Sequence, residues 1–246
     1  MARQDTHRPA RRPADGKQVS AARILAAAFG AGAGLLGLEH GFFETRQGSA
    51  TPGGLVIHAI GSSCQPHTAW HGCEPALTVI PSFRATGIAA MLLALAVLIW
   101  AAAFVNRQHD GLILLLLVAL FLAGGGFTTF WFGLLAGIAA TQITAPPARW
   151  RTWLGPALTR LLARLWPWLF IAYLAWAAGS WMIAAISNAV MLHLTPAVTA
   201  ATPFVLVLIL LSALAHDSQQ SQAAQQPEGP PPDGRDELME VRHGQD

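Results

Sequence analysis

The sequence predicts an all-α, polytopic helical membrane protein with about six spans and with both termini in the cytoplasm. Of the 246 residues, 53% are hydrophobic and only 11% are charged, which is more apolar surface than one soluble core can bury. The charges are also unevenly placed. The chain has 15 basic and 13 acidic side chains, and only 11 of these charged side chains lie within residues 24–215. We therefore expect a membrane-embedded region between two solvated tails.

The two tails differ in composition. Residues 1–23 carry six basic and two acidic side chains without an apolar period, which predicts a disordered basic head. Basic residues beside an apolar span mark its cytoplasmic side. Residues 216–246 are rich in Gln, Pro and acidic residues, which predicts a disordered cytoplasmic tail that cannot support a packed core.

Apolar runs define the spans of the bundle, residues 24–215. Residues 24–43 are long enough for a helix to cross a bilayer, which takes about 20 residues. A second run follows at 84–105, and the last two runs lie at 167–187 and 198–215. The polar, glycine-rich residues 44–81 separate the first two runs, and we expect them to form an extracytoplasmic loop.

Residues 111–143 form the ambiguous run, because a single helix of that length would be about 50 Å long. That is too long for one span and barely enough for two. Three glycines in the middle of the run, Gly124, Gly125 and Gly126, can adopt positive φ and turn the chain back. We therefore predict a short hairpin for the third and fourth spans, in either a spanning or a re-entrant form.

The basic segment 147–166 supports this turn. It contains four arginines and no acidic residue, and the positive-inside bias places it in the cytoplasm only if the chain has turned back. Its Trp and Leu residues recur at helical spacing, which predicts an amphipathic helix in the headgroup region, divided near Pro156. Anionic lipids of the inner leaflet would bind its arginines, so we expect no nucleic-acid partner. These lipid-facing basic residues are Arg149, Arg151, Arg160 and Arg164.

The first span contains a glycine motif, in which Gly32, Gly34 and Gly37 spell G-x-G-x-x-G. A dinucleotide-binding loop needs a preceding strand and an acidic residue about 20 positions later, and neither is present. Small residues four apart instead let membrane helices approach closely. Gly30 with Gly34, and Gly37 with Gly41, are such pairs, so we expect a central packing helix that also offers a face to a membrane-protein partner or a second copy.

Ionisable residues gather on the predicted outer side. His40 and Glu44 are four positions apart and therefore share a helix face, while Glu39 lies within the first span, where a charge is costly and indicates function. The alternative to a functional role is that Glu39 and His40 only form hydrogen bonds to neighbouring helices near the membrane interface. The candidate polar cluster comprises Glu39, His40, Glu44, His58 and Glu74.

The outer loop contains the spacing C-x2-H-x3-H-x-C, formed by Cys64, His67, His71 and Cys73. Two cysteines in an oxidising compartment favour a disulfide, so we predict a Cys64–Cys73 bridge that closes the loop into a cap. The alternative is a metal site in which all four side chains bind zinc.

Three classes of function follow from these patterns. The first is a non-enzymatic membrane subunit or scaffold, with no cofactor. The second is a small transporter or channel that uses the glycine break at residues 124–126 and the Glu39/His40 pair. The third is a membrane metalloprotein or haem protein that uses the outer histidines.

Overall fold

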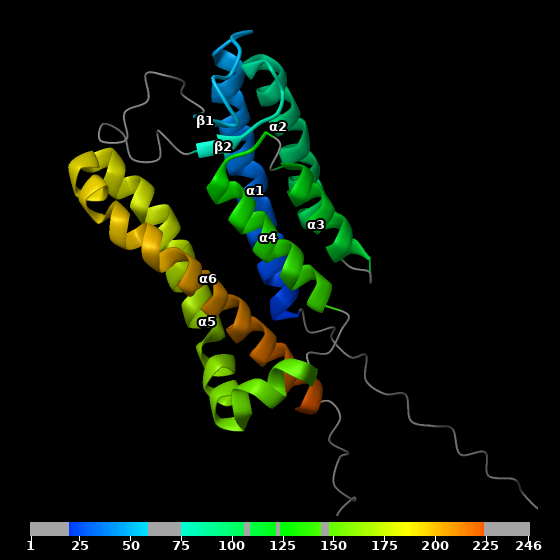
Figure 1. Ribbon diagram of the computed structural model, residues 1–246. Helices are drawn as coiled ribbons and strands as arrows, with labels where there is room; N and C mark the ends of the chain where they lie inside the picture. The colour runs from blue at the N-terminus through cyan, green and yellow to red at the C-terminus, as the bar shows by residue number, and fades with distance from the viewer. Residues whose placement is uncertain (1–19, 59–74, 106–108, 122–123, 144–147, 224–246) are drawn as a thin grey trace, which may run out of the picture. The chain divides into compact units, whose positions relative to one another are not determined.

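The computed structural model describes residues 20–58, 75–105, 109–121, 124–143 and 148–223. Two compact units divide the chain, residues 1–143 and 144–246. The described residues form six α-helices, a short π-helix and one two-stranded sheet (Figure 1). The all-α class is therefore confirmed, with a small sheet that the sequence did not predict.

Helices α1 (Ala21–Arg46) and α2 (Phe83–Ile99) form an antiparallel pair in the first unit. Each begins after a serine, Ser20 or Ser82, whose side chain accepts a hydrogen bond from a backbone N–H in the first turn, as is typical of N-caps. A π-helix, η1 (Trp100–Phe104), extends α2. The second run predicted at 84–105 therefore agrees closely with α2 and η1.

Helices α3 (Asp110–Phe121) and α4 (Phe127–Gln142) form the predicted hairpin. A Cβ added to Gly111 would meet Thr141, and one added to Gly137 would meet Leu115, so the two helices run antiparallel. The glycines at the turn were expected to adopt positive φ. That reason is wrong, because Gly126 has a φ of −73°. Positive φ occurs instead at Gly48 and Gly155 among the described glycines.

Close packing explains the glycines at the turn. A Cβ on Gly125 would lie 2.6 Å from the Phe121 ring, and one on Gly124 would lie 3.3 Å from the Thr86 carbonyl oxygen. The turn therefore fits against α2 because it has no side chains there. Gly126 also forms an isolated antiparallel bridge with Ala76.

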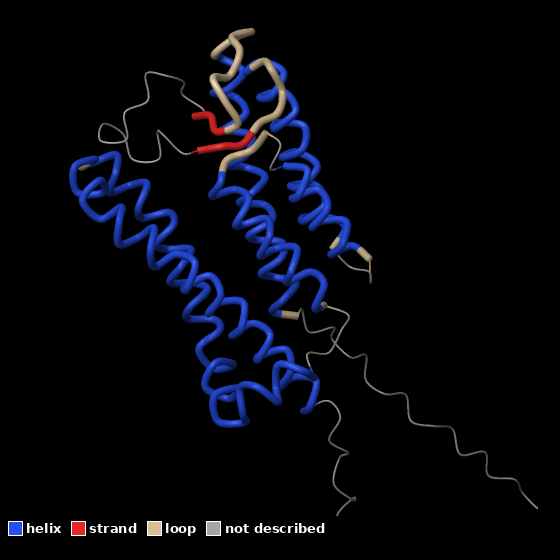
Figure 2. The backbone as a smooth tube through the Cα atoms, in the orientation of Figure 1, coloured by secondary structure: helices blue, strands red, loops and turns tan. Residues whose placement is uncertain are grey.

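Strands β1 (Val56–His58) and β2 (Pro75–Leu77) pair antiparallel, with Ile57 opposite Ala76. They lie at the end of the first unit where α1 ends and the α3–α4 turn is located (Figure 2). The predicted loop 44–81 is thus partly helix and partly sheet, because α1 continues to Arg46.

The core of the first unit consists mainly of small and apolar side chains. Helix α1 packs against α2, η1 and α4, with its buried face formed by Ala22, Ala26, Ala33 and its glycines. Phe121 of α3 packs against Ala90 and Ala94 of α2. The Phe29 and Phe132 rings meet edge to face, with their centroids 5.4 Å apart, and join α1 to α4.

The second unit is a hairpin of two long helices, α5 (Ala148–Ile186) and α6 (Asn188–Ala223), which turn at Ser187. Both are longer than the predicted runs 167–187 and 198–215. Pro167 of α5 and both Pro196 and Pro203 of α6 lie within continuous helix.

The predicted amphipathic helix 147–166 is not a separate element. Gly155, with φ 66° and ψ 161°, breaks α5 near the expected position, and the helix after it continues without interruption to Ile186. The segment predicted as interfacial is therefore one short helical piece followed by the first turns of a long helix.

The predicted boundary of the tail at Ala215 is too early. Helix α6 continues to Ala223, Ser218 is buried, and the His216 Nδ1 atom lies 3.2 Å from the Ala163 carbonyl oxygen of α5. Polar residues after Ala215 therefore pack against α5. Residues 1–19 and 224–246, which include most of both predicted tails, lie outside the described residues.

Four described helices are long and apolar enough to cross a membrane: Ala21–Arg46, Phe83–Phe104, Leu154–Ile186 and Asn188–Ala223. Helix α3, with 12 residues, and α4, with 16 residues, are shorter. At 1.5 Å per residue, α3 spans only about 18 Å. The third and fourth of the six predicted spans are thus shorter than the thickness of the hydrocarbon core, about 30 Å.

Candidate functional site

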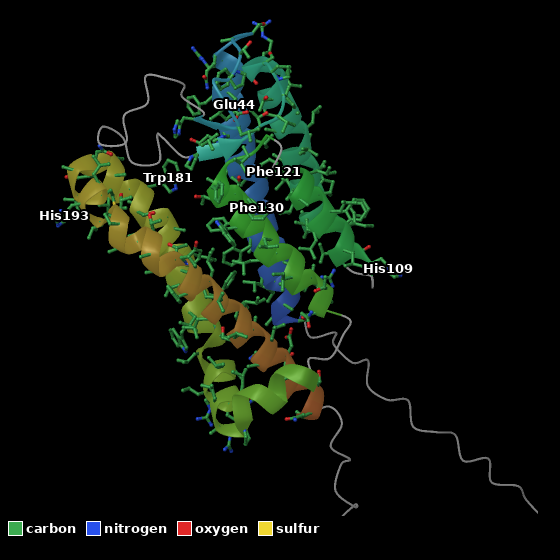
Figure 3. The ribbon with its side chains drawn as sticks, in the orientation of Figure 1. Glu44, His109, Phe121, Phe130, Trp181 and His193 are labelled. Carbon is green, nitrogen blue, oxygen red and sulfur yellow. The ribbon has the colours of Figure 1, made fainter. Side chains whose placement is uncertain are left out.

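A buried pair of ionisable side chains lies near the end of α1. The His40 Nε2 atom is 3.2 Å from the Glu44 Oε1 atom, and the two side chains are only 6% and 0% exposed. The spacing of four residues places them one above the other on the same face of the helix. Glu44 lies at the end of the first unit that also holds the strands (Figure 3).

The helical repeat explains why Glu44 is buried. Gly37, Gly41 and Glu44 follow one another along a single face of α1. A Cβ on Gly37 would meet Phe121 and Ala94, and one on Gly41 would lie 2.6 Å from the Gly87 carbonyl oxygen. Glu44, one turn further, therefore points into the interface between α1, the start of α2 and the tip of the α3–α4 hairpin.

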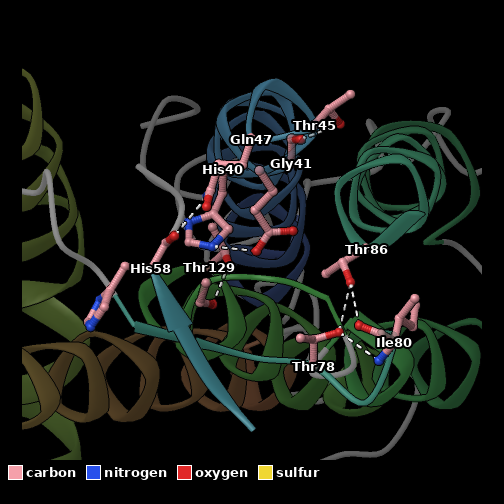
Figure 4. Close-up of polar contacts among 11 residues, drawn as sticks. His40, Gly41, Thr45, Gln47, His58, Thr78, Ile80, Thr86 and Thr129 are labelled. Carbon is pink, nitrogen blue, oxygen red and sulfur yellow. Dashed lines mark hydrogen bonds and ion pairs between the residues drawn. The ribbon is translucent and has the colours of Figure 1, made fainter. Parts of the chain in front are cut away.

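Three buried threonines surround this end of the unit. Thr78 follows β2, Thr86 belongs to α2 and Thr129 belongs to α4. The Thr78 and Thr86 hydroxyls are 2.9 Å apart, and the Thr129 hydroxyl donates to the Gly126 carbonyl oxygen (Figure 4). We call His40, Glu44 and these three threonines the Glu44 cluster.

The hydroxyls have hydrogen-bond partners, whereas the ion pair leaves atoms without one. His40 Nε2 and both carboxylate oxygens of Glu44 are buried and form no hydrogen bond with any described residue. Burying such groups without a partner costs about 1–3 kcal/mol each, and more for a charged group. A buried polar group of this kind is uncommon in a folded protein and needs an explanation.

The structure brings only part of the predicted polar cluster together. Glu39 lies on the exposed face of α1, so its predicted contact with the interior is not observed. The His58 carbonyl oxygen accepts a hydrogen bond from Gln47 Nε2 at 3.0 Å. The His58 imidazole points away from His40 and Glu44 (Figure 4). Glu74 lies outside the described residues.

The cysteine and histidine residues of the outer loop also lie outside the described residues. The structure therefore leaves untested both the predicted disulfide between Cys64 and Cys73 and the alternative metal site with His67 and His71. Within the described residues, no three His, Cys, Asp or Glu side chains gather as a group that could hold a metal ion.

The four glycines singled out in the first span contact this chain's own helices. A Cβ on Gly30 or Gly34 would overlap Ala101 or Leu98, and one on Gly37 or Gly41 would overlap Phe121 or α2. The alternative in which these glycines bind a partner or a second copy is therefore not supported, because helices of the same unit occupy that face.

The predicted lipid-facing arginines lie on α5. Arg160 and Arg164 are exposed, one turn apart on the same side of the helix, next to the buried Leu162 and Ala163. Arg149 and Arg151 lie in the short piece before Gly155, and their side chains are not among those described.

Sequence reasoning missed the three threonines of the Glu44 cluster. Thr129 follows the glycine turn by three residues, and Thr86 follows the N-cap Ser82 by four. The sequence does contain one signal for them, because all three threonines lie near the ends of apolar segments that meet at one end of the first unit.

No protein-family model, curated protein or solved structure matches the chain.

Proposed function

We propose that this chain is a multi-pass protein of the cell membrane that works as a non-enzymatic subunit or scaffold, and that it binds a transmembrane helix of a partner through α5. The observation that carries this proposal is Gly179, which lies inside α5 about two turns before the helix ends. A Cβ added there would meet no heavy atom of α6, the other helix of its unit, within 4 Å.

The other helical glycines show why Gly179 is unusual. Each described glycine within α1, α2, α3 and α4 has a neighbour within 4 Å of an added Cβ. Glycine in a helix is about 1 kcal/mol less favourable than alanine, and in the first unit close packing offsets that cost. At Gly179 no described contact does so.

The surroundings of Gly179 suit a membrane partner. Ala172 and Ala175 are exposed on the same side of α5, and they continue the small-residue face by which membrane helices associate. Trp176 and Trp181 are exposed nearby. Exposed apolar side chains can simply pack against lipid tails, so they do not by themselves indicate a protein partner. A glycine in a helix does indicate one, because it allows the backbone of another helix to approach closely.

Gly179→Leu should therefore leave the fold unchanged and weaken assembly by at least about tenfold, since a bulky side chain separates helices that meet at their backbones. Mass measurement of the protein in native nanodiscs, with its partners retained, would show loss of the complex. Met182→Leu, an exposed apolar change on α5, is the matched control and should retain it.

Two outcomes would contradict the subunit proposal. One is a wild-type protein that occurs only as a single chain in native nanodiscs. The other is disulfide cross-linking of Gly179→Cys to a cysteine placed in α1, α2, α3 or α4 of the same chain, because the partner helix would then be its own.

Topology is a separate part of the proposal, with both termini in the cytoplasm. The contacts of Gly30 with Ala101 and Ala136, and of Gly111 with Thr141, support its first-unit part, since they bring the start of α1 and the end of α4 to one end of that unit. Reporter fusions after Asp110, Ile143 and Asp246 should therefore all give a cytoplasmic signal. A fusion after Gly61 should report the outside, and opposite signals at Asp110 and Ile143 would contradict this threading.

The buried His40–Glu44 pair favours a transporter or channel as the second candidate. A transport path through the first unit would have to pass Phe121, Val118 and Leu114, which are buried apolar side chains between this pair and the far end of the unit. These side chains argue against such a path. Ion flux into liposomes that contain the purified protein, lost in His40→Ala, would favour the transporter over the subunit.

A further inference from the structure

Three buried atoms of the Glu44 cluster have no hydrogen-bond partner among the described residues: His40 Nε2, Glu44 Oε1 and Glu44 Oε2. They come from two residues on a single helix face, and the Glu44 side chain is fully buried. A carboxylate has only acceptor atoms, and an imidazole nitrogen either donates or accepts. Direct pairing of the two groups would be the simplest way to satisfy them.

The two side chains lie at ion-pair distance but without the geometry of a hydrogen bond. The Nε2 and Oε1 atoms are 3.2 Å apart, which is within hydrogen-bonding distance, yet they do not form a hydrogen bond. Their directions are therefore unsuitable even though their separation is suitable.

This separation is the one expected of two ligands on the same metal ion. Zinc binds histidine nitrogen and carboxylate oxygen at about 2.0–2.2 Å in tetrahedral geometry. Two ligands at those distances with a tetrahedral angle are separated by about 3.3 Å. Residues at i and i+4 on one helix face supply such a pair of ligands, as in metal-binding helices.

We propose that His40 Nε2 and the Glu44 carboxylate bind one divalent transition-metal ion of the zinc type at the end of α1. The nitrogen ligand disfavours calcium and magnesium, which prefer oxygen. The two side chains supply two positions, and water or a further ligand takes the others. This site is distinct from the outer-loop alternative, which uses Cys64, His67, His71 and Cys73.

The charged groups of the elements around the site are consistent with a bound cation. Among the described residues, Glu39 and Arg46 of α1 and Arg84 of α2 are exposed, and Arg46 lies over the Phe42 ring. Helix α4 and strand β2 contain no charged residue. No described lysine or arginine side chain is therefore buried at the site to neutralise Glu44.

The test uses the full-length protein in detergent, stripped of metal by a chelator and titrated with Co²⁺ and then with Zn²⁺. Wild type should bind one equivalent with a visible Co²⁺ spectrum. His40→Ala and Glu44→Gln should each weaken binding by at least about tenfold, the size of effect known even for outer-shell partners of metal ligands. Glu39→Gln and His58→Ala are the matched controls and should bind as wild type does.

A measurement on the wild-type protein keeps the proposal testable if a variant fails to fold. Pulsed electron paramagnetic resonance of the Cu²⁺-loaded protein should show coupling to one imidazole nitrogen, and the joint variant His67→Ala/His71→Ala should retain that signal. Three results would overturn the proposal: no stoichiometric metal in wild type, no imidazole coupling, or loss of the metal in the joint loop variant alone.

Discussion

Gly34→Leu is expected to unfold the first unit or prevent its assembly. A Cβ at this position would lie 2.6 Å from the Leu98 Cβ and 2.9 Å from the Ala94 carbonyl oxygen, so even alanine would force α1 and α2 apart. The Ala94 oxygen is a backbone atom and cannot rotate away. Overpacking of a core typically costs 1–3 kcal/mol, and a whole leucine between two backbones should cost about 3 kcal/mol or more.

Gly179→Leu is the control for this prediction, because it places the same side chain inside a helix at a position without a neighbour in its own unit. Unfolding by SDS titration, followed by circular dichroism, should show a lower transition for Gly34→Leu and an unchanged one for Gly179→Leu. Equal transitions for Gly34→Leu and wild type would show that the contact between α1 and α2 is not as close as described.

The joint variant His40→Leu/Glu44→Leu is expected to be more stable than wild type when both are free of metal. Replacing a buried ion pair with apolar side chains of similar volume is often neutral or stabilising, by about 1–4 kcal/mol. The gain should be in the upper part of this range, because three atoms of the pair have no hydrogen-bond partner.

The same SDS titration in the presence of a chelator measures this effect. Glu39→Leu, an exposed change one residue away, should alter the free energy of unfolding by no more than about 0.5 kcal/mol. A joint variant less stable than metal-free wild type would mean that the pair stabilises the fold directly. In that case its burial would need no functional explanation.

Local patterns predicted the helices and the turn of the first unit well. The glycine run at residues 124–126 indicated a hairpin, and the basic segment after it indicated that the chain returns. The reason given for these glycines was wrong, because the space around Gly124 depends on Thr86, which is distant in sequence, and the space around Gly125 depends on where the nearby Phe121 ring lies. Periodicity identifies a face of a helix but not the atoms that lie against it.

The second unit was predicted less well for a specific reason. The expected runs began at Pro167 and at residue 198, just after Pro196, whereas both helices continue through these prolines, although proline is a strong helix breaker in water. In membrane helices, neighbouring side chains can satisfy the groups that a proline leaves without a partner. The Thr195 and Thr202 hydroxyls donate hydrogen bonds to the carbonyl oxygens of Met191 and Val198, each one residue before the carbonyl that the following proline leaves without its helical partner.

The candidate site was predictable in one respect only. The spacing of His40 and Glu44 placed them on a common face, and the structure has them there. The position of Glu39 one residue earlier turns it by about 100° around the helix, away from that face. Which of the two acidic residues points inward depends on where α2 and α4 pack, and no local pattern gives that.

The two prolines of α6 have a mechanical consequence. Neither Pro196 nor Pro203 can donate the backbone hydrogen bond of a helix, and seven residues place both weakened turns on nearly the same side. Helix α6 therefore lacks a backbone hydrogen bond at two points on nearly the same side, so it should bend more easily in one direction than in the others. We expect tension in a thinning bilayer to bend α6 in that plane before it separates the close backbone contacts between α1 and α2.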